Sequence, residues 1–341
     1  MKAAILRGPN DVRLEELSVP KPGQGEILVK MVACGVCGTD IEKLQGHSIT
    51  PPVLGHEVVG EIAEVGGGVH KYAVGDRVFA HHHVPDYTCR YCRKGAYTMC
   101  DSFPKTNLDP CGFAEYFRVP EPNVRLGAVL RLPEGISWED GVMIEPLGCC
   151  IRGLMKCRID PGDSALVIGA GPIGLMHTHL LKAFGAGTVI TSDLIDSRLQ
   201  TALTLGADHI VNPQRDDLSK RVGEWTEGTG VDLAVIAVGS AKLIGQGIDL
   251  VRKGGTVCVF GMPRPNDVLS YNASQIFIRE VSIVPSYSTS ELETNTALRL
   301  MLSNRINVSQ LITHRFKLGQ IREALECAEG RRESLKVVVF S

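Results

Sequence analysis

The sequence lacks an excess of charge of either sign, and it lacks long apolar runs. Its 36 Lys and Arg residues nearly balance 38 Asp and Glu residues, which gives a formal net charge of −2 at pH 7. A nearly neutral chain has no overall field that attracts nucleic acid or an anionic membrane surface. Nowhere do eighteen apolar residues follow one another, so no transmembrane helix is predicted. We therefore expect a small-molecule partner, and neither nucleic acid nor a membrane.

The start of the sequence also lacks the features of a secretion signal. The first thirty residues alternate apolar and charged side chains and contain no continuous apolar core. We therefore expect a soluble, cytoplasmic protein in which the eleven cysteines stay reduced. Under those conditions the cysteines are better interpreted as metal ligands or core residues than as partners in disulfides.

The 341 residues suffice for two domains of ordinary size. Up to about residue 145, short alternating runs broken by Gly and Pro predict a β-rich, barrel-like domain. From Ser164 onward, buried runs of about six residues alternate with helical lengths, which indicates a parallel sheet with helices on both faces. We expect an α/β protein with domains at 1–145 and 146–287, and with 288–341 returning to the first domain.

A glycine-rich turn opens the second domain. Gly169, Gly171 and Gly174 form the pattern G-x-G-x-x-G, which permits a tight turn and presents helix N–H groups to a pyrophosphate. Asp193 ends the next strand, nineteen residues after Gly174, and can either bind an adenosine ribose or cap the following helix. Its charge would repel a ribose 2′-phosphate, so the sequence favours NAD over NADP. Arg198 could weaken that preference by supplying a cation.

Three cysteines near residue 90 have the spacing of a structural zinc site. Cys89, Cys92 and Cys100 occupy three positions of a four-thiolate pattern, and the position of the missing first thiolate holds Asp86. A carboxylate keeps the charge of a thiolate and binds zinc at a similar distance. The segment therefore predicts a structural zinc with one oxygen ligand; the alternative is a decayed site that has lost its metal.

Four further residues predict a second, catalytic zinc site. Cys37, His56 and Glu57 lie in the β-rich half, and Glu145 lies at the junction before the second domain. Three protein ligands drawn from Cys, His and carboxylate, with one position left for water or substrate, are typical of a catalytic zinc. Each fragment alone is common, so the prediction depends on their joint occurrence.

The motifs CGTD, GHE, EPL and GAGPIG occur in this order along the chain. With them the sequence resembles the zinc-dependent medium-chain dehydrogenases, and within these the branch of polyol (sorbitol-type) and L-threonine 3-dehydrogenases. The resemblance covers essentially the whole chain. It implies a GroES-like catalytic domain followed by a Rossmann domain that binds NAD, with the catalytic zinc in the cleft between them. It also implies a homotetramer, which the structural zinc lobe often supports in this family.

The resemblance implies roles for individual residues. The family's ligands to the catalytic zinc correspond to Cys37, His56 and Glu57. Glu145 matches a residue that binds this metal directly or through its water, and Thr39 matches a hydroxyl that passes on the substrate's proton. The next member of the proton relay is often a histidine, and here its place holds Glu42. The proton can therefore leave through Glu42, through ribose hydroxyls or through water.

Cofactor contacts are implied in the same way. They lie in and after the glycine-rich turn: Gly169, Gly171, Ile173, Gly174, Asp193, Arg198, Phe260, Gly261, Met262, Ser286 and Tyr287. His83 coincides with a histidine found near the substrate in threonine dehydrogenases, and we interpret it as a specificity residue. The run 81–83 of three histidines is not interpreted as a metal site, because consecutive side chains on a strand point to alternating sides.

Together these parts predict hydride transfer between NAD and a secondary alcohol or ketone. Zinc acts as a Lewis acid on the alcohol, Thr39 accepts the proton, and the nicotinamide accepts the hydride. The substrate stays open among polyols, vicinal diols and threonine, because the sequence does not position the loops that form the pocket.

Two other functions compete with this one. A zinc-free, NADPH-dependent quinone or enone reductase would share the architecture, but it would not need Cys37, His56, Glu57 and Glu145 together. A zinc-ribbon protein that binds nucleic acid or senses redox state could be built around residues 86–100. The neutral net charge and the lack of a basic stripe with interleaved aromatics argue against that alternative.

Overall fold

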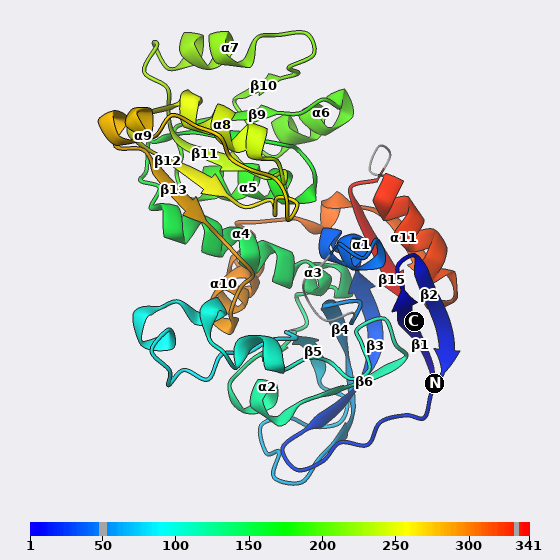
Figure 1. Ribbon diagram of the computed structural model, residues 1–341. Helices are drawn as coiled ribbons and strands as arrows, with labels where there is room; N and C mark the ends of the chain where they lie inside the picture. The colour runs from blue at the N-terminus through cyan, green and yellow to red at the C-terminus, as the bar shows by residue number, and fades with distance from the viewer. Residues whose placement is uncertain (48–52, 331–333) are drawn as a thin grey trace. The chain divides into compact units, whose positions relative to one another are not determined.

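The chain folds into two units that differ in their type of β-sheet. The structure is a computed structural model and describes residues 1–47, 53–330 and 334–341. The first unit combines Met1–Gly148 with Thr289–Ser341, and the second unit consists of Cys149–Ser288. Each unit is built around a sheet of its own (Figure 1).

The first unit is rich in β-structure. Its strands are β1 (Lys2–Gly8), β2 (Asp11–Glu16), β3 (Ile27–Gly35), β4 (Glu57–Val65), β5 (Arg77–Ala80), β6 (Tyr116–Val119), β7 (Val129–Arg131), β14 (Ile312–Lys317) and β15 (Lys336–Phe340). The main sheet has the order β14-β15-β3-β4-β5-β7, with β6 also paired to β3, while β1 and β2 form a separate hairpin. Strands β14 and β15 pair in parallel, whereas β3 pairs antiparallel with β15, β4 and β6.

The register across β15, β3 and β4 determines which residues meet near Cys37, His56 and Glu57. Most residues of β3 are buried on both faces, which fits its nearly continuous apolar sequence. Gly35, at the end of β3, pairs with Glu57 of β4 on one side and with Val338 of β15 on the other. Strand β15, from the C-terminal part of the chain, therefore lies beside β3, which ends two residues before Cys37.

The helices of the first unit are short. They are α1 (Gly38–Leu44), α2 (Glu121–Arg125), α3 (Trp138–Val142), α10 (Glu291–Leu302) and α11 (Ile321–Gly330). Single 3₁₀ turns occur at η1 (Cys92–Lys94), η2 (Tyr97–Met99), η3 (Phe103–Lys105), η4 (Ser309–Leu311) and η5 (Leu318–Gln320). Helix α4 (Ile144–Cys157) begins in the first unit and ends in the second.

The second unit contains a parallel six-stranded sheet. Its strands are β8 (Ser164–Ile168), β9 (Thr188–Ser192), β10 (His209–Val211), β11 (Val231–Ile236), β12 (Val251–Val259) and β13 (Ser282–Pro285). Its further helices are α5 (Pro172–Ala183), α6 (Asp196–Thr204), α7 (Leu218–Trp225), α8 (Ala241–Leu250) and α9 (Ala273–Arg279). The strand order β10-β9-β8-β11-β12-β13 is that of the Rossmann fold, in which ligands bind beyond the carboxyl ends of the strands where the order reverses. That reversal lies between β8 and β11.

The expected fold class is confirmed, since a β-rich unit and a doubly wound parallel unit both form. One local expectation is wrong. Strand β5 ends at Ala80, so His81–His83 follow the strand instead of belonging to it, and the alternation of strand side chains does not apply to them. The ring centroids of His82 and His83 lie 3.9 Å apart. Even so, none of these histidines joins a group able to hold a metal within the described ranges.

Membrane-spanning structure was not expected from the sequence. Among residues 1–47, 53–330 and 334–341, no helix combines the length and apolar character needed to cross a bilayer.

Candidate active site and metal sites

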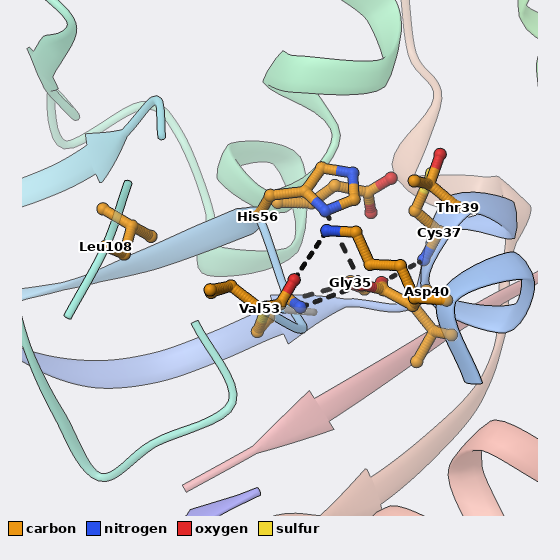
Figure 2. A network of polar contacts seen from close by, with 12 residues as sticks. Gly35, Cys37, Thr39, Asp40, Val53, His56 and Leu108 are labelled. Carbon is orange, nitrogen blue, oxygen red and sulfur yellow. Dashed lines mark hydrogen bonds and ion pairs between the residues drawn. The ribbon is translucent and has the colours of Figure 1, made fainter. Parts of the chain in front are cut away.

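Three side chains of the first unit come together where β3 and β4 meet. Cys37 follows β3 by two residues, His56 directly precedes β4, and Glu57 is the first residue of β4. One ligand atom from each lies within 4.8 Å of those from the other two. His56 and Glu57 are buried, and Cys37 is partly exposed. The residues expected to bind the catalytic metal therefore form one cluster, in which Figure 2 shows Cys37 and His56.

Asp40 fixes the arrangement of this cluster. Its buried carboxylate accepts hydrogen bonds from the backbone N–H groups of Cys37 at 3.0 Å and Gly55 at 2.9 Å. Its Oδ1 also lies 3.7 Å from Nδ1 of His56 (Figure 2). A carboxylate behind a histidine ligand sets the orientation of the ring and leaves the other nitrogen for the metal. This role of Asp40 was not predicted from the sequence, although Asp40 is part of the CGTD motif.

The charged groups of the cluster interact strongly with one another, and its donor atoms suit a metal. Burial alone would lower the pKa of His56, but Asp40 and then Cys37 outweigh burial and raise that pKa well above its ordinary value. Burial would raise the pKa of Asp40, yet His56 opposes it and the net pKa is lowered. Oε1 of Glu57 is buried and has no hydrogen-bond partner among the described residues. A largely buried site with sulfur, nitrogen and oxygen donors fits a zinc ion.

The other residues expected to take part in the chemistry lie around this cluster. Sγ of Cys37 is 3.7 Å from Oγ1 of Thr39, so the hydroxyl adjoins the cluster. Glu42 lies near His47, with 3.8 Å between Oε2 and Nδ1, and the His47 side chain is 51% exposed. No role for His47 was predicted from the sequence. Glu145 is buried in the first turn of α4 but lies outside the group of ligand atoms within 4.8 Å.

Two histidines pack beside the metal cluster. The ring centroid of His82 lies 4.9 Å from that of His56. Burial, followed by the charges of His83 and His56, holds the pKa of His82 well below its ordinary value. Burial also lowers the pKa of His83 to about 4, and Nδ1 of His83 lies 2.6 Å from the carbonyl oxygen of Thr106. Both rings are therefore neutral at pH 7, and the specificity role of His83 stays a prediction.

The second predicted metal group also assembles. One ligand atom from each of Asp86, Cys89, Cys92 and Cys100 lies within 4.8 Å of those from the others. Oδ1 of Asp86 accepts hydrogen bonds from the N–H groups of Thr88 at 2.7 Å and Cys89 at 2.9 Å. These bonds hold the pKa of Asp86 well below its ordinary value. The other oxygen, Oδ2, accepts a hydrogen bond from Oγ of Ser102 at 3.4 Å. The ionised carboxylate therefore has a second oxygen, besides Oδ1, that can bind a metal.

The segment around this group has little apolar material of its own. Its buried cluster consists of Cys92, Cys100 and Phe103, with Tyr97 and Cys89 packed against them. A small lobe with so few apolar side chains gains its stability from a crosslink or a metal. The cysteines are free thiols. The lobe therefore fits a structural metal.

In the second unit, the glycine-rich turn has the geometry that its sequence predicts. Gly169 has a φ of 98°, a conformation that side chains rarely adopt. A Cβ on Gly174 would lie 1.7 Å from the carbonyl oxygen of Gly169, whereas a Cβ on Gly171 would meet nothing within 4 Å. Gly171 also forms the N-cap of α5, followed directly by Pro172. The turn thus leaves open space at the helix N-terminus, where a phosphate group can approach.

Asp193 follows β9 and contacts this turn. Its Oδ2 accepts a hydrogen bond from the N–H of Ala170 at 2.6 Å, and its Oδ1 accepts one from Ile195 at 2.8 Å. The carboxylate therefore ties the end of β9 to the turn after β8. The sequence suggested two roles for Asp193, a ribose contact and a helix cap. The hydrogen bond from Ala170 was not among them. Arg198 lies in the first turn of α6 and is partly buried.

The remaining expected cofactor residues follow other strands of the same sheet. Ile173 lies in the first turn of α5 and its carbonyl oxygen accepts from the thiol of Cys150 at 3.8 Å. Phe260 and Gly261 follow β12, and both of their N–H groups bind the carbonyl oxygen of Ile236 at the end of β11. Residues Met262, Ser286 and Tyr287 come after β12 or β13; Met262 and Tyr287 are exposed, and Oγ of Ser286 is buried without a hydrogen-bond partner among the described residues. These residues therefore lie at the carboxyl ends of the strands, as in sheets that bind dinucleotides.

Comparison with known proteins connects both units to one family. The family model described as the alcohol dehydrogenase GroES-like domain matches residues 23–134, and that described as zinc-binding dehydrogenase matches residues 172–303. Sorbitol dehydrogenase of Bacillus subtilis (strain 168) is 31% identical over 349 residues, covering 100% of this chain and 97% of the relative. L-threonine 3-dehydrogenase of Pyrococcus abyssi is 36% identical over 322 residues, covering 92% and 90%.

The solved structures agree with this assignment. An alcohol dehydrogenase from Escherichia coli CFT073, complexed with NADH, matches with a TM-score of 0.90 at 28% identity and covers 100% of this chain and 99% of its own. The resemblance stated from the motifs is therefore confirmed. The chain belongs to the zinc-binding medium-chain dehydrogenases, in the branch of the sorbitol and L-threonine dehydrogenases, and is an oxidoreductase of that family.

Proposed function

We propose that this protein is a zinc-dependent, NAD-linked dehydrogenase that interconverts a secondary alcohol and its ketone. The observation that carries the proposal is the cluster of Cys37, His56 and Glu57, whose ligand atoms lie within 4.8 Å of one another, with Asp40 behind His56. A polyol, a vicinal diol or L-threonine is the proposed substrate class, because the relatives named above act on sorbitol and L-threonine.

The residues of the chain divide the chemistry among them. A zinc ion held by Cys37, His56 and Glu57 supplies Lewis-acid polarisation of the substrate oxygen, and Glu145 is proposed as an additional or alternative ligand. Thr39, which adjoins Cys37, accepts the hydroxyl proton. Glu42 is the proposed next member of the relay, and its neighbour His47 offers a route to solvent because half of its side chain is exposed.

The proposed hydride carrier is NAD, bound at the glycine-rich turn of the second unit. Gly171 leaves room for the pyrophosphate, and Asp193 places a carboxylate at the end of β9. A carboxylate there repels a ribose 2′-phosphate and so favours NAD over NADP. The further contacts proposed are those of Ile173, Arg198, Phe260, Gly261, Met262, Ser286 and Tyr287.

The test of this function is an NAD-reduction screen over threonine, sorbitol, xylitol, 2,3-butanediol and simple primary alcohols, with and without a chelator. We expect turnover with at least one secondary alcohol, and we expect its loss when the catalytic zinc is removed. Turnover that survives complete removal of metal would contradict the zinc mechanism. It would favour the zinc-free reductase, whose NADPH-dependent reduction of a quinone or enone is assayed in parallel.

A second, structural zinc is proposed at Asp86, Cys89, Cys92 and Cys100. Asp86 keeps its charge because backbone N–H groups bind Oδ1, so the site retains an anionic first ligand in place of a thiolate. Oxygen is a harder donor than sulfur, so this ion should be held less tightly than one in a four-cysteine lobe. The alternative of a zinc-ribbon binding protein gains no support from the family assignment.

We predict about two zinc ions per chain in the wild type and about one in Asp86→Ala. The variant should also melt at a lower temperature, because the lobe has few apolar side chains to replace the metal. Metal analysis and thermal unfolding measure both effects, and Asp101→Ala, an exposed carboxylate next to Cys100, is the matched control. One zinc per chain in the wild type, with an unchanged melting temperature in Asp86→Ala, would support the decayed site instead.

A homotetramer in the cytoplasm is the proposed state of the protein. Free thiols are typical of a reducing compartment. The second unit exposes apolar side chains on α9 and on β13, the last strand of its described sheet: Phe277 is 83% exposed, Ile278 68% and Ile283 36%. Exposed apolar side chains and an edge strand both favour association of subunits. A mass measurement in solution tests this assignment.

A further inference from the structure

A buried lysine lies beside the candidate catalytic metal cluster. Lys336 is 4% exposed and is the first residue of β15. Its ammonium forms an ion pair with Oε2 of Glu57 and donates a hydrogen bond to the carbonyl oxygen of Val36 at 3.0 Å. The lysine is therefore a fixed positive charge next to one of the proposed zinc ligands.

The fold brings these groups together across three neighbouring strands. Gly35 on β3 pairs with Glu57 on β4, and it pairs on its other side with Val338, two residues after Lys336 on β15. A Cβ on Gly35 would lie 2.0 Å from Oε2 of Glu57 and 3.0 Å from Cε of Lys336. The absence of a side chain at Gly35 therefore leaves the space in which the carboxylate and the ammonium meet.

Competition for one carboxylate follows from this geometry. Glu57 is fully buried, and Oε1 has no hydrogen-bond partner among the described residues, so Lys336 and a bound cation would share its charge. An ammonium that holds one oxygen reduces the negative charge that the carboxylate offers to the metal. If the lysine were absent, the buried carboxylate would have no cationic partner except the metal.

We propose that Lys336 is a positioning residue that holds the Glu57 carboxylate and competes with the catalytic zinc for it. The inference rests on the zinc site of the proposed function. Lys336 thereby limits how tightly the site binds zinc and keeps more positive charge at the metal, where it acts on the substrate oxygen. The lysine does not touch substrate or cofactor in this role and acts through Glu57 alone.

The test is the rate at which zinc leaves the protein in excess chelator. Lys336→Met removes the charge and keeps an unbranched apolar chain. We expect zinc to leave this variant roughly tenfold more slowly than the wild type, because the metal then has the Glu57 carboxylate to itself. Removing the partner of a metal ligand usually lowers metal affinity by about 10 to 100-fold, so a slower release distinguishes competition from support. The phase of zinc release that is missing in Cys37→Ser identifies the catalytic ion. Release at the wild-type rate, or faster, would overturn the proposal.

Four further variants make the result specific. Lys336→Arg keeps the positive charge, so its rate of zinc release should stay close to that of the wild type. Lys182→Met removes a different, partly exposed lysine from its ion pair with Asp208 in the second unit, and it should leave zinc release unchanged. If Lys336→Met fails to fold because Glu57 is left unpaired, Glu57→Gln with Lys336→Met removes both charges. This double variant should release zinc at the same rate as Glu57→Gln alone, and a different rate would show that Lys336 does not act through Glu57.

The outcomes separate this inference from the proposed function. If the wild type has no zinc phase that Cys37→Ser abolishes, the proposed catalytic site is wrong. If that phase is present and Lys336→Met does not slow it, the site stands and only the role of Lys336 is refuted. Steady-state kinetics of Lys336→Met test the same distinction. Loss of positive charge at the metal should lower kcat more than it changes the KM for NAD.

Discussion

Replacement of Cys37 by serine is expected to abolish nearly all turnover while cofactor binding is retained. A serine hydroxyl is not ionised at neutral pH, so the site loses a negative donor and with it the catalytic zinc. We expect activity to fall by more than the roughly 10 to 100-fold that follows changes to groups behind a metal ligand. The glycine-rich turn lies in the second unit, whereas Cys37 lies in the first, so the affinity for NAD should stay close to that of the wild type.

The measurement combines turnover, zinc content and NAD affinity of the purified variant. Cys327→Ser is the matched control, because Cys327 is a partly buried thiol of the same unit that belongs to neither metal group. The control should keep turnover and both zinc ions. Near-normal turnover in Cys37→Ser would refute the zinc mechanism, and loss of NAD binding would show that the substitution disturbs more than the metal site.

The second large effect is expected at Asp193. Wild type should prefer NAD, and Asp193→Gly should narrow that preference by removing both the acceptor for the ribose and the charge that repels a 2′-phosphate. A hydrogen bond to a charged group contributes about 1.5 to 3 kcal/mol, which corresponds to roughly tenfold to over a hundredfold in affinity. The ratio of kcat/KM for NAD to that for NADP should fall by this order.

The structure requires a second variant in this experiment. Asp193 also accepts hydrogen bonds from the N–H groups of Ala170 and Ile195, so glycine at this position also loosens the phosphate-binding turn. Asp193→Asn keeps an oxygen acceptor and removes the charge, and it should narrow the preference with a smaller loss of total activity. Asp196→Asn, an exposed residue paired with Arg215, should leave the ratio unchanged. A wild type that already favours NADP would show that Arg198 or another cation dominates Asp193.

Much of the fold and of the metal groups could be predicted because the signals are local or carried by motifs. The alternating apolar runs predicted the strands, and the glycine spacing predicted the turn after β8. The cysteine spacing predicted that Asp86 and three cysteines come together. Cys37 and His56 are nineteen residues apart, and no periodicity links them. The resemblance to a family supplied that association, and the structure brings the two side chains together.

Other roles could not be predicted, because they arise from contacts between residues that no sequence spacing relates. Lys336 and Glu57 are 279 positions apart and meet only because β15 and β4 flank the same strand. The bond from Ala170 to Asp193 depends on the direction of one carboxylate, for which a sequence offers several roles. The end of β5 at Ala80 was missed because three histidines in a row continue an apparently extended run. Their burial and mutual contacts became clear only from the packing around His56.

The pairing of β3 with β15 has a consequence for the order in which the protein folds. Strands β3 and β15 lie side by side, yet the whole second unit, Cys149–Ser288, stands between them in the chain. During synthesis the second unit leaves the ribosome complete while the sheet of the first unit still lacks β14 and β15. The Rossmann unit can therefore fold before the sheet of the first unit is complete. Strand β6 already pairs with Ile27–Lys30 of β3, whereas residues 33–35 of β3 lack their partner until translation has reached β15.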